Sequence, residues 1–555
     1  MKRDIDQLTS QTFDVVIVGG GIYGATAAWD AASRGLSVAL IEKGDFGGAT
    51  SANSLKTIHG GLRYLQQLDF KRMRESIRER SLLMYLAPHL VHPLSVVMPT
   101  YGMLMKSKHV MWAGMLLNDI ISFDRNKNKD KQKKIPACMV ISKNACLRLL
   151  PGIEPDRVTG GAFWTDAQMY NSERMLLSFI LSAEKAGAQA ANYVQATGFI
   201  QNGNQIEGVK AKDLISGQEV EIKSRMVLNT AGAWVDPLLG TLKPSNKFQL
   251  STAMNLIVDR EMLANCAAGV SGRFSYPLPS GGESNRTHVL FMAPWRGKTI
   301  FGTYHRPYSG NPDDMKPTKS DIDAFLKEVN TAWPKDPVKP KEVSYVQKGF
   351  LPMDGINAKS GEVNLTKHYA IHDHEKEEGL SGLLTVIGVK YTTARDVSEK
   401  MINLIVQKLG AKVKSCQTRK TRLVGGEIER FNDFMSGLKD VVPEGVSEIS
   451  KRHLGLNYGT LVEDVLDLGK EDASLLEILP GSEEALKAEV VYAIRNEMAQ
   501  KLSDVILRRT DLGSAGHPGK DAVQACAYLM AKELGWDAKR IKEEIATVDA
   551  IYDYE

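Results

Sequence analysis

Short apolar runs and a segment of helical character alternate at the start of the chain. Residues 13–18 and 36–41 are apolar and rich in β-branched side chains, which is typical of buried parallel strands. The Ala-rich segment between them, residues 25–33, predicts a helix that closes at Arg34-Gly35. Together the three segments predict a βαβ unit of about 30 residues, as a nucleotide-binding domain requires.

The same patterns predict the order of elements further along. Helices are expected at residues 69–86, 109–123, 173–187 and 392–409, and buried strands at residues 190–194, 226–229 and 383–389. Turns at Asn202-Gly203 and Ser216-Gly217 predict a hairpin or meander over residues 196–228. Residues 250–350 predict a mostly antiparallel sheet, and a basic linker at residues 411–422 precedes a helical tail.

Composition places the chain among globular proteins of several domains. Of its 555 residues 43% are hydrophobic and 25% charged, which excludes a disordered, collagen-like or disulfide-stapled chain. Lys and Arg total 70 against 66 Asp and Glu, so the net charge of +4 gives no case for nucleic acid as a partner. The five cysteines are scattered without metal-ligand spacing, so we expect reduced thiols and no metal site.

The expected location of the protein in the cell follows from the length and position of its apolar segments. The first 12 residues have no apolar core of a signal peptide, and no stretch reaches the ~20 apolar residues of a spanning helix. We therefore expect a cytoplasmic protein. Its oligomeric state cannot be read from the sequence, and a homodimer stays open.

A glycine motif carries the first chemistry. Residues 19–24 read GGGIYG and fit G-x-G-x-x-G, in which Gly19 permits a tight turn, Gly21 lets the backbone approach a pyrophosphate, and Gly24 lets the helix pack on the strand. Glu42 ends the second strand, where an acid is expected to bind a ribose hydroxyl. An acid there disfavours NADP, and the motif alone does not separate FAD from NAD.

A longer motif separates them. Residues 49–65 read ATSANSLKTIHGGLRYL and resemble the ATSSxSSKLIHGGLRYL segment of the FAD-dependent glycerol-3-phosphate dehydrogenases. Four further segments carry the same resemblance, namely NTAGAWV at 229–235, FGT at 301–303, GVKYTT at 388–393 and LRRTDLG at 507–513. The resemblance covers nearly the whole chain, including its tail.

The resemblance implies an α/β and α+β architecture with three parts. They are a glutathione-reductase-like FAD-binding Rossmann domain (residues 1–95, 150–250 and 350–410), a substrate and membrane-facing domain on a mixed or antiparallel sheet (96–149 and 251–349), and a C-terminal helical domain (411–555).

The resemblance implies functional positions residue by residue, and His305 and Arg306 are added from this sequence alone. The cofactor-binding residues expected are Gly19, Gly20, Gly21, Gly24, Glu42, Thr50, Ser51, His59, Gly60, Gly61, Ala231, Gly232, Gly388, Lys390 and Thr392. The catalytic residues expected are His59, Arg63 and Lys390, and the substrate contacts are Arg63, Tyr64, His305, Arg306 and Lys390.

Each assignment has a chemical reason and an alternative. His59 is the expected base, because imidazole titrates near working pH, although it could bond the backbone as a structural histidine. Arg63 would clamp the substrate anion or form a surface ion pair. Lys390 would stabilise negative charge on the reduced flavin. His305 and Arg306 are absent from the family pattern and would bind an anion or belong to a surface loop.

The chain also departs from the family. In the family's GxRPL segment, Phe350 is taken to replace the Arg that binds the substrate phosphate. The GTTD segment becomes Gly302-Thr303-Tyr304-His305, the KGxH segment becomes residues 252–255 (TAMN), and the second serine of SSK becomes Leu55. Because Arg offers a bidentate phosphate fork and Phe offers none, the substrate is in question.

Residues 109–134 have the character of a membrane-surface segment. An apolar helix at 109–123 is followed by a basic run at 125–134 that we expect to be exposed, and this combination suits an anionic membrane surface. The family resemblance implies the inner face of the cell membrane and quinone as electron acceptor. The alternative is a buried helix followed by a solvated loop.

Four functions remain open at this point. The first is oxidation of sn-glycerol 3-phosphate to dihydroxyacetone phosphate, with electrons passing through FAD to quinone. The second is the same reaction type on another polyol phosphate or a hydroxy acid, and the third is an oxidase that reduces oxygen. The fourth is a catalytically silent, FAD-stabilised interaction protein, against which the retained His59, Arg63 and Lys390 argue.

Overall fold

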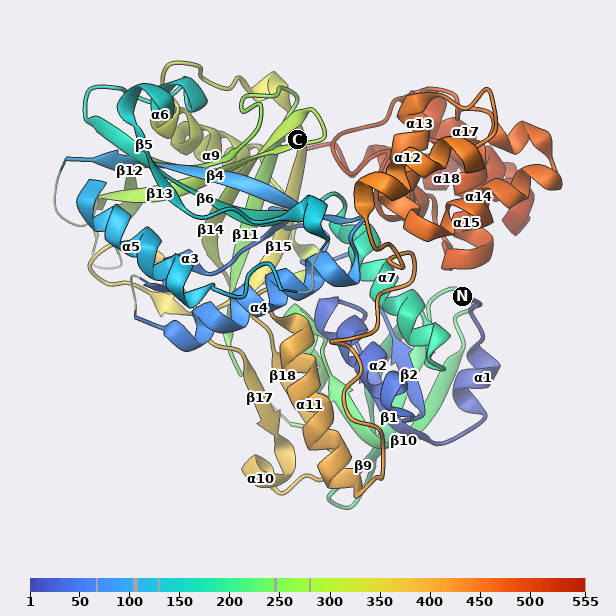
Figure 1. The fold of residues 1–555 in the computed structure, drawn as a ribbon. Helices are drawn as coiled ribbons and strands as arrows, with labels where there is room; N and C mark the ends of the chain where they lie inside the picture. Colours follow the sequence, from blue (N-terminus) through green and yellow to red (C-terminus); the bar gives the residue numbers. More distant parts are fainter. Residues whose placement is uncertain (66–67, 103–107, 128–129, 244–246, 279–280, 555) are drawn as a thin grey trace.

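Two sheets and a helical C-terminal domain make up the fold (Figure 1). The structure is a computed structural model, and it describes residues 1–65, 68–102, 108–127, 130–243, 247–278 and 281–554. The helices outside the C-terminal domain are α1 (Ile5–Thr9), α2 (Ile22–Arg34), α3 (Leu62–Leu65), α4 (Phe70–Leu86), α5 (Lys108–Ile121), α6 (Lys143–Leu149), α7 (Ser172–Lys185), α8 (Val235–Leu239), α9 (Lys319–Ala332), α10 (His374–Glu378) and α11 (Ala394–Leu409).

The first sheet carries the predicted βαβ unit. Its order is β17 (Ala370–Asp373), β18 (Leu383–Ile387), β10 (Glu219–Asn229), β1 (Phe13–Val18), β2 (Val38–Ile41) and β7 (Gln189–Ala191). β1 pairs in parallel with both β2 and β10, and α2 joins β1 to β2. The predicted meander is confirmed as β8 (Val194–Asn202), β9 (Gln205–Asp213) and β10. The helices α2, α7 and α11 pack together and bury the apolar face of this sheet.

The second sheet is mostly antiparallel, as residues 250–350 predicted. Its order is β16 (Val363–Leu365), β15 (Val343–Ile356), β11 (Gln249–Val258), β14 (Lys298–Tyr308), β13 (Glu283–Trp295), β12 (Ala267–Pro277), β4 (Val91–Tyr101), β6 (Val158–Met169) and β3 (Thr57–Ile58), with β5 (Met139–Ser142) paired to β6. The strands β3 and β6 fall in segments that we assigned to the FAD-binding part. They belong to this second sheet because β6 pairs with β4 along its length and β3 pairs with β6.

The apolar helix and the basic run after it differ in their exposure. Helix α5 agrees with the predicted 109–123, and none of the helices within the described ranges is long and apolar enough to cross a membrane. The expectation of an exposed basic run fails at Lys133, which is buried. Its ammonium donates to the Val91 carbonyl at 3.1 Å and lies 3.9 Å from the Phe431 ring centre, which ties this segment to the C-terminal domain.

The helical tail is confirmed as a separate domain that packs against the first sheet's helices (Figure 1). It comprises α12 (Phe431–Val441), α13 (Glu448–Tyr458), α14 (Val462–Leu466), α15 (Lys487–Glu497), α16 (Leu502–Asp504), a π-helical turn η9 (Val505–Arg509), α17 (Lys520–Leu534) and α18 (Ala538–Asp549). Arg174 of α7 forms a buried ion pair with Glu497 at 2.6 Å, so the tail is joined to the nucleotide domain by charge as well as by apolar contact.

A second buried pairing reaches the turn after β2. Both carboxylate oxygens of Asp45 accept hydrogen bonds from Arg509 at 2.8 Å, and Arg508 Nε donates to Asp45 Oδ2 at 2.6 Å. Burial alone would raise the pKa of Asp45, but the two guanidinium groups hold it far below its usual range. Because Asp45 lies three residues after Glu42, the tail fixes the turn that ends the predicted ribose site.

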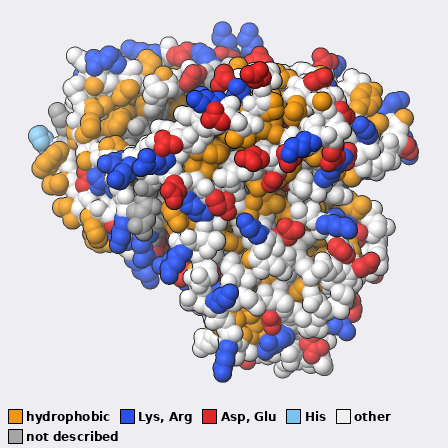
Figure 2. Space-filling view, turned by 45° about the vertical axis from the view of Figure 1, so that its right-hand side comes forward, with side chains coloured by type: hydrophobic (Ala, Val, Ile, Leu, Met, Phe, Trp, Pro, Cys, Tyr) orange, Lys and Arg blue, Asp and Glu red, His pale blue; other side chains and the backbone are white. Residues whose placement is uncertain are grey.

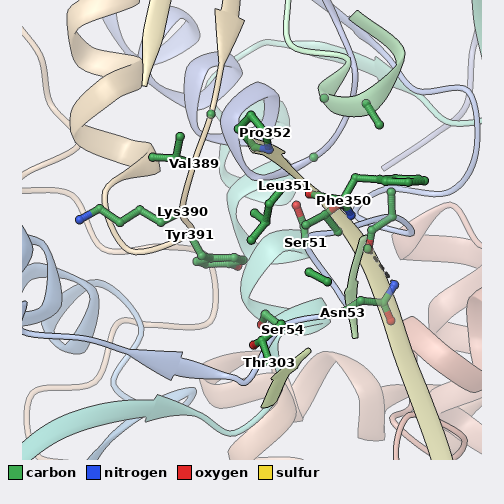
Figure 3. A pocket seen from close by; sticks show the side chains of 18 of the residues that line it. Ser51, Asn53, Ser54, Thr303, Phe350, Leu351, Pro352, Val389, Lys390 and Tyr391 are labelled. Carbon is green, nitrogen blue, oxygen red and sulfur yellow. Dashed lines mark hydrogen bonds between the residues drawn. The ribbon is translucent and has the colours of Figure 1, made fainter. Parts of the chain in front are cut away.

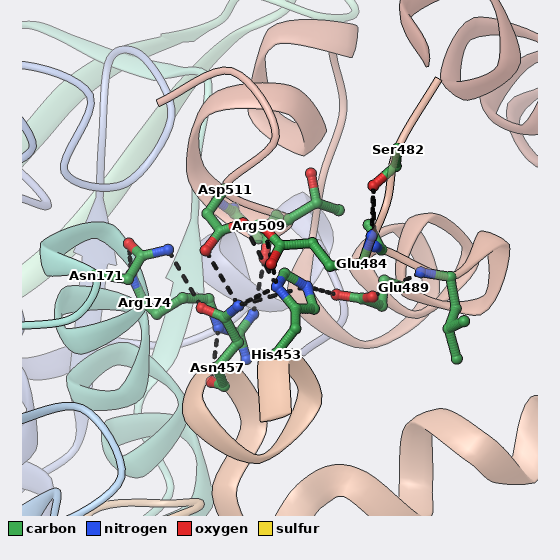
Figure 4. A network of polar contacts seen from close by, with 12 residues as sticks. Asn171, Arg174, His453, Asn457, Ser482, Glu484, Glu489, Arg509 and Asp511 are labelled. Atoms are coloured by element: carbon green, nitrogen blue, oxygen red, sulfur yellow. Dashed lines mark hydrogen bonds and ion pairs between the residues drawn. The ribbon is translucent and has the colours of Figure 1, made fainter. Parts of the chain in front are cut away.

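A polar network between α7 and the tail contains one group with metal-ligand geometry (Figure 4). Among the described residues this group is His453, Glu484 and Asp511. Arg296 of the second sheet lies 3.4 Å from Glu484 and 3.1 Å from Asp511. Burial would lower the pKa of His453, but Glu489 and Asp511 raise it to about 9. Arg296 and His453 therefore already pair with these carboxylates, and the cluster is an ion-pair network.

We expect Arg509→Met to lower the free energy of unfolding by about 3–5 kcal/mol, because it leaves Asp45 buried with one of its two arginines. Arg495→Met is the matched control, since Arg495 bridges Glu471 and Glu533 on the surface of the same domain and should cost about 1 kcal/mol or less. Urea unfolding followed by circular dichroism measures both. Equal shifts in the two variants would refute a special role for the Asp45 pairing.

Candidate functional site

A cavity of about 2880 Å³ lies between the two sheets and runs from the glycine motif to His59 and Lys390. It brings together residues that are far apart in the sequence, and Figure 3 shows part of its wall. The expected site residues that line it are Gly19, Gly21, Glu42, Thr50, Ser51, His59, Gly61, Tyr64, Ala231, Gly232, His305, Arg306, Gly388, Lys390 and Thr392. The described structure does not include the side chain of Arg63.

The glycines of the motif differ in what they do. Gly19 has a φ of +103°, which a side chain rarely adopts, and a Cβ on Gly24 would lie 1.9 Å from the Gly19 carbonyl oxygen. A Cβ on Gly20 would meet Phe46 at 2.7 Å. Gly21 is different, because a Cβ there would meet only Ser51 Oγ, at 3.4 Å. Gly20 and Gly24 therefore serve packing, and Gly21 faces the space before α2.

Glu42 is oriented by backbone amides rather than by another side chain. Its Oε2 accepts from the Gly20 amide at 2.6 Å and its Oε1 from the Gly44 amide at 2.7 Å. Burial raises the pKa of Glu42, although both amides lower it. The carboxylate thus sits at the β2 end, beside the glycine turn, where the motif requires an acceptor for ribose.

The loop after β2 ties the cavity to the second sheet. Ser51 Oγ accepts from the Ile22 amide at the start of α2, at 3.0 Å. Thr50 Oγ1 accepts from the Phe350 amide at 2.9 Å and donates to the Phe350 carbonyl at 3.1 Å. Thr50 therefore satisfies backbone groups of β15 and fixes the distance between the loop and the sheet.

His59 lies against a buried carboxylate. Its Nδ1 is 3.6 Å from Asp166 Oδ2, and its side chain is 48% exposed whereas that of Asp166 is buried. Asp166 also accepts from the Gly60 amide at 2.6 Å, from Arg80 at 2.8 Å and from the Trp164 indole at 3.0 Å. Burial would raise the pKa of Asp166, but His59 and Arg80 hold it well below its usual range. Because Nδ1 is the ring nitrogen nearest the carboxylate, His59 Nε2 is directed away from it.

Gly60 has a packing role that the sequence did not indicate. A Cβ there would lie 2.3 Å from Arg80 Nη1, so the Arg80–Asp166 pair requires glycine at this position. Gly61 has a φ of +82° and gives close access to the cavity beside His59.

Lys390 is half-buried and has neutral partners. Its ammonium donates to the Tyr64 hydroxyl at 2.9 Å and to Ser76 Oγ at 3.0 Å, and burial lowers its pKa. Tyr23, from the glycine motif, donates to the Lys390 carbonyl at 2.9 Å and accepts from the Val389 amide at 3.2 Å. Tyr23 therefore holds the turn that presents Lys390.

The register of the second sheet separates His305 from Arg306. Directly opposite residues of antiparallel strands share a face. Arg306 opposes Thr252 and shares a face with Tyr304, and its guanidinium lies 3.6 Å from Asp321 of α9. His305 of β14 lies opposite Ala253 of β11, and Ala253 lies opposite Gly349 of β15, so the three residues share one face of the sheet. That face looks toward the loop after β2, because a Cβ on Gly349 would meet Thr50 at 3.0 Å. His305 thus faces the loop that follows β2, whereas Arg306 faces α9.

The same register corrects the role given to Phe350. Phe350 shares the face of Arg306 and packs on Tyr308, with ring centres 5.0 Å apart. Leu351 points to the other side of β15, toward the cavity centre (Figure 3). The residue directly before Pro in GxRPL corresponds to Leu351, so the missing phosphate cation is replaced by Leu351 and not by Phe350. The site still lacks that arginine.

Two of the other departures, Asn255 and Leu55, lie beside the retained Gly302-Thr303 pair. Thr303 Oγ1 donates to Asn255 Oδ1 at 3.0 Å, and Asn255 donates weakly to the Asn53 carbonyl at 3.4 Å. A Cβ on Gly302 would meet Leu55 at 2.7 Å. Asn255 and Leu55 are therefore fitted to the same part of β14.

Sequence reasoning missed several members of the site. The sequence offered a sign of Asp166, which is an acid inside an apolar strand. It also offered a sign of Ser76 and Arg80, whose spacing of four residues puts them on one face of α4. For Arg508 of the tail, which lines the cavity near Gly48, it offered none.

Two family models match the chain. The model of FAD dependent oxidoreductases matches residues 14–388, and the model of the C-terminal domain of alpha-glycerophosphate oxidase matches residues 416–541. The boundary between them falls in the basic linker before the helical tail.

Curated relatives match over their full length. A glycerol-3-phosphate dehydrogenase of Synechocystis sp. is 31% identical over 98% of this chain and 97% of its own length. An alpha-glycerophosphate oxidase of Lactococcus lactis is 27% identical over 98% of this chain and 96% of its own.

A solved structure supports the fold. The glycerol-3-phosphate dehydrogenase of Bacillus halodurans, solved with FAD, has a TM-score of 0.75 at 23% identity and covers 99% of this chain and 96% of its own. With a family model over most of the chain and a relative 31% identical along its length, this protein belongs to the FAD-dependent glycerol-3-phosphate dehydrogenase family of oxidoreductases, and its cofactor is FAD.

Proposed function

We propose that the protein oxidises sn-glycerol 3-phosphate to dihydroxyacetone phosphate. The observation that carries the proposal is the His59–Asp166 pair, which shares one cavity with Lys390 and the glycine motif. Relatives named for this substrate, dehydrogenases and an oxidase alike, support it. A silent interaction protein would have no need of a histidine beside a buried carboxylate and a half-buried lysine in one cavity.

The cofactor fits the residues present. The space before Gly21 and the start of α2 would take the FAD pyrophosphate, and Glu42 would accept from the ribose. Bound FAD supplies the hydride acceptor. Thr50, Ser51, Ala231, Gly232, Gly388 and Thr392 line the same cavity and would contact the cofactor.

The chain's own residues would divide the chemistry between them. His59 would accept the hydroxyl proton of the substrate at Nε2, and Asp166 would stabilise the imidazolium that forms. Lys390 would balance negative charge in the buried site. Tyr64 and His305 line the cavity and would contact the substrate. Arg63 stays a predicted substrate contact, since its side chain lies outside what the structure describes.

A different substrate is the second candidate, and Leu351 is the observation that favours it. An apolar side chain stands where the family pattern has a phosphate-binding arginine. Another polyol phosphate or a 2-hydroxy acid would tolerate this change better if it were less anionic at that end.

We further propose that electrons pass to quinone at a membrane surface. Helix α5 exposes Trp112, Leu116 and Ile120, and Phe123 follows it with an exposure of 80%. Apolar side chains gather at the left edge of Figure 2, with lysine and arginine beside them. The opposite face of α5 contributes Met111 and Met115 to the cavity wall, so an apolar acceptor would reach the cavity from this side. An oxidase that uses oxygen is the alternative.

Anaerobic mixing of the FAD-loaded protein with sn-glycerol 3-phosphate should bleach the flavin absorbance. His59→Asn should slow this reduction by about 100- to 10 000-fold while FAD content stays unchanged, because the base is lost and the fold is not. Stopped-flow absorbance measures the rate. No bleaching of the wild type by this substrate, with bleaching by a 2-hydroxy acid, would favour the second candidate.

Gly21→Val should lose FAD without unfolding the chain. The added side chain meets only Ser51 in the protein, so it occupies the space proposed for the pyrophosphate. Gly24→Val is the contrasting variant, and it should not fold, since even a Cβ would lie 1.9 Å from the Gly19 carbonyl oxygen. Flavin absorbance and circular dichroism of the purified proteins test both. A Gly21→Val protein with full flavin content would place the cofactor elsewhere.

The double variant Trp112→Ser, Ile120→Ser should abolish flotation with anionic vesicles. Each exposed apolar side chain that enters the interface contributes up to about 1.5–3 kcal/mol, and high salt should weaken wild-type binding because the basic residues are screened. Ile449→Ser, Tyr528→Ser is the control, because both residues are exposed on the C-terminal domain. Wild-type protein that stays unbound at low salt rules out the membrane proposal.

A further inference from the structure

One face of helix α4 lies beside the part of the cavity that contains His59 and Lys390. Arg72, Ser76 and Arg80 are spaced by four residues and therefore form one stripe on the helix. Arg80 binds Asp166 beside His59, and Ser76 binds Lys390. Arg72, which is the third member of the stripe, also lines the cavity and has had no role so far.

The guanidinium of Arg72 is held in position by Tyr64 and Asp69. It lies 4.2 Å from the ring centre of Tyr64, and Lys390 lies 4.5 Å from the same ring. Its nearest carboxylate is Asp69, at 3.7 Å, and its side chain is only 12% exposed. Within the described ranges, the Arg72 guanidinium donates no hydrogen bond, so its planar fork of donors is available.

Positive charge gathers at this point, although Asp69 lies 3.7 Å from Arg72. Burial lowers the pKa of Lys390, and the charge of Glu75 acts in the opposite direction. Among the described residues no carboxylate comes within ion-pair distance of Lys390, whose ammonium bonds two hydroxyl groups. Arg72 and Lys390 both contact Tyr64, and together they bring two positive charges to one wall of the cavity. An anionic group bound there would offset the cost of burying both cations.

The wall formed by β14 and β15, both within the described ranges, provides no arginine for the phosphate. Leu351 offers no cation at the position of the family's arginine, and Arg306 is turned to α9 by its contact with Asp321. Beyond His305 and Arg63, which are already proposed as substrate contacts, the cations that line the cavity beside Tyr64 are Lys390 and Arg72.

We infer that Arg72 is a substrate-binding residue that receives the phosphate, or another terminal anion, of the substrate in place of the arginine missing from β15. Stacking on Tyr64 fixes the guanidinium plane, and Lys390 adds the second charge. The inference rests on the proposed function, which supplies the anionic substrate.

Steady-state kinetics of the FAD-loaded full chain test the inference with three variants. Arg72→Met should raise KM for sn-glycerol 3-phosphate roughly 10- to 100-fold, with a smaller change in kcat, because a charge-assisted contact to substrate is lost. Arg72→Lys keeps the charge with fewer donors and should fall between. Arg78→Met is the matched control, since Arg78 lies on the exposed face of the same helix and should match wild type.

Two further measurements separate this inference from general damage and from failure of the proposed function. Glycerol, which lacks the phosphate, should show the same kcat/KM in wild type and Arg72→Met, and FAD content should be equal. Inorganic phosphate, titrated against the flavin absorbance, should bind wild type more tightly than Arg72→Met whether or not sn-glycerol 3-phosphate is the true substrate. Equal phosphate affinity and equal KM in Arg72→Met and Arg78→Met would overturn the inference.

Discussion

The buried carboxylate of Asp166 is the constraint on which the substrate end of the structure depends. A charge in the interior must be paired and hydrogen-bonded, and Asp166 meets this requirement with groups from three different elements. The Gly60 amide comes from the turn after β3, Arg80 from α4, and Trp164 from β6 itself. Satisfying one carboxylate thus fixes the His59 turn, the helix beside it and the sheet in one arrangement.

The cofactor end follows the same principle with Asp45. Its partners, Arg508 and Arg509, come from a π-helical turn of the tail more than 460 residues away. π-Helical turns occur frequently at functional sites, and this one sets two adjacent arginines on one acid. Since Arg508 also lines the cavity, the helical domain contributes to the cavity wall.

Between these two ends, the side of the sheet on which a side chain lies decides what it can contact. Residues 305 and 306, or 350 and 351, are neighbours in sequence, yet the pleat sends them to opposite sides of the sheet. A one-residue difference in alignment therefore exchanges a side chain that faces the loop after β2 for one on the face that Arg306 presents to α9. This is why the missing cation is assigned to Leu351, and why the α4 stripe becomes relevant to anion binding.

The sequence by itself determined the βαβ unit, the meander, the antiparallel sheet and the helical tail, because each depends on local periodicity and turn residues. It also determined the family and FAD, since the glycine motif and the HGGLRYL segment are contiguous. Only the tertiary structure decided that β3 and β6 join the second sheet, that Lys133 is buried, and that Asp166, Ser76 and Arg72 surround the site. These features arise from pairing between segments distant in the chain, where strand register and helix face select the contacts, and no local pattern encodes which distant partner satisfies a buried charge.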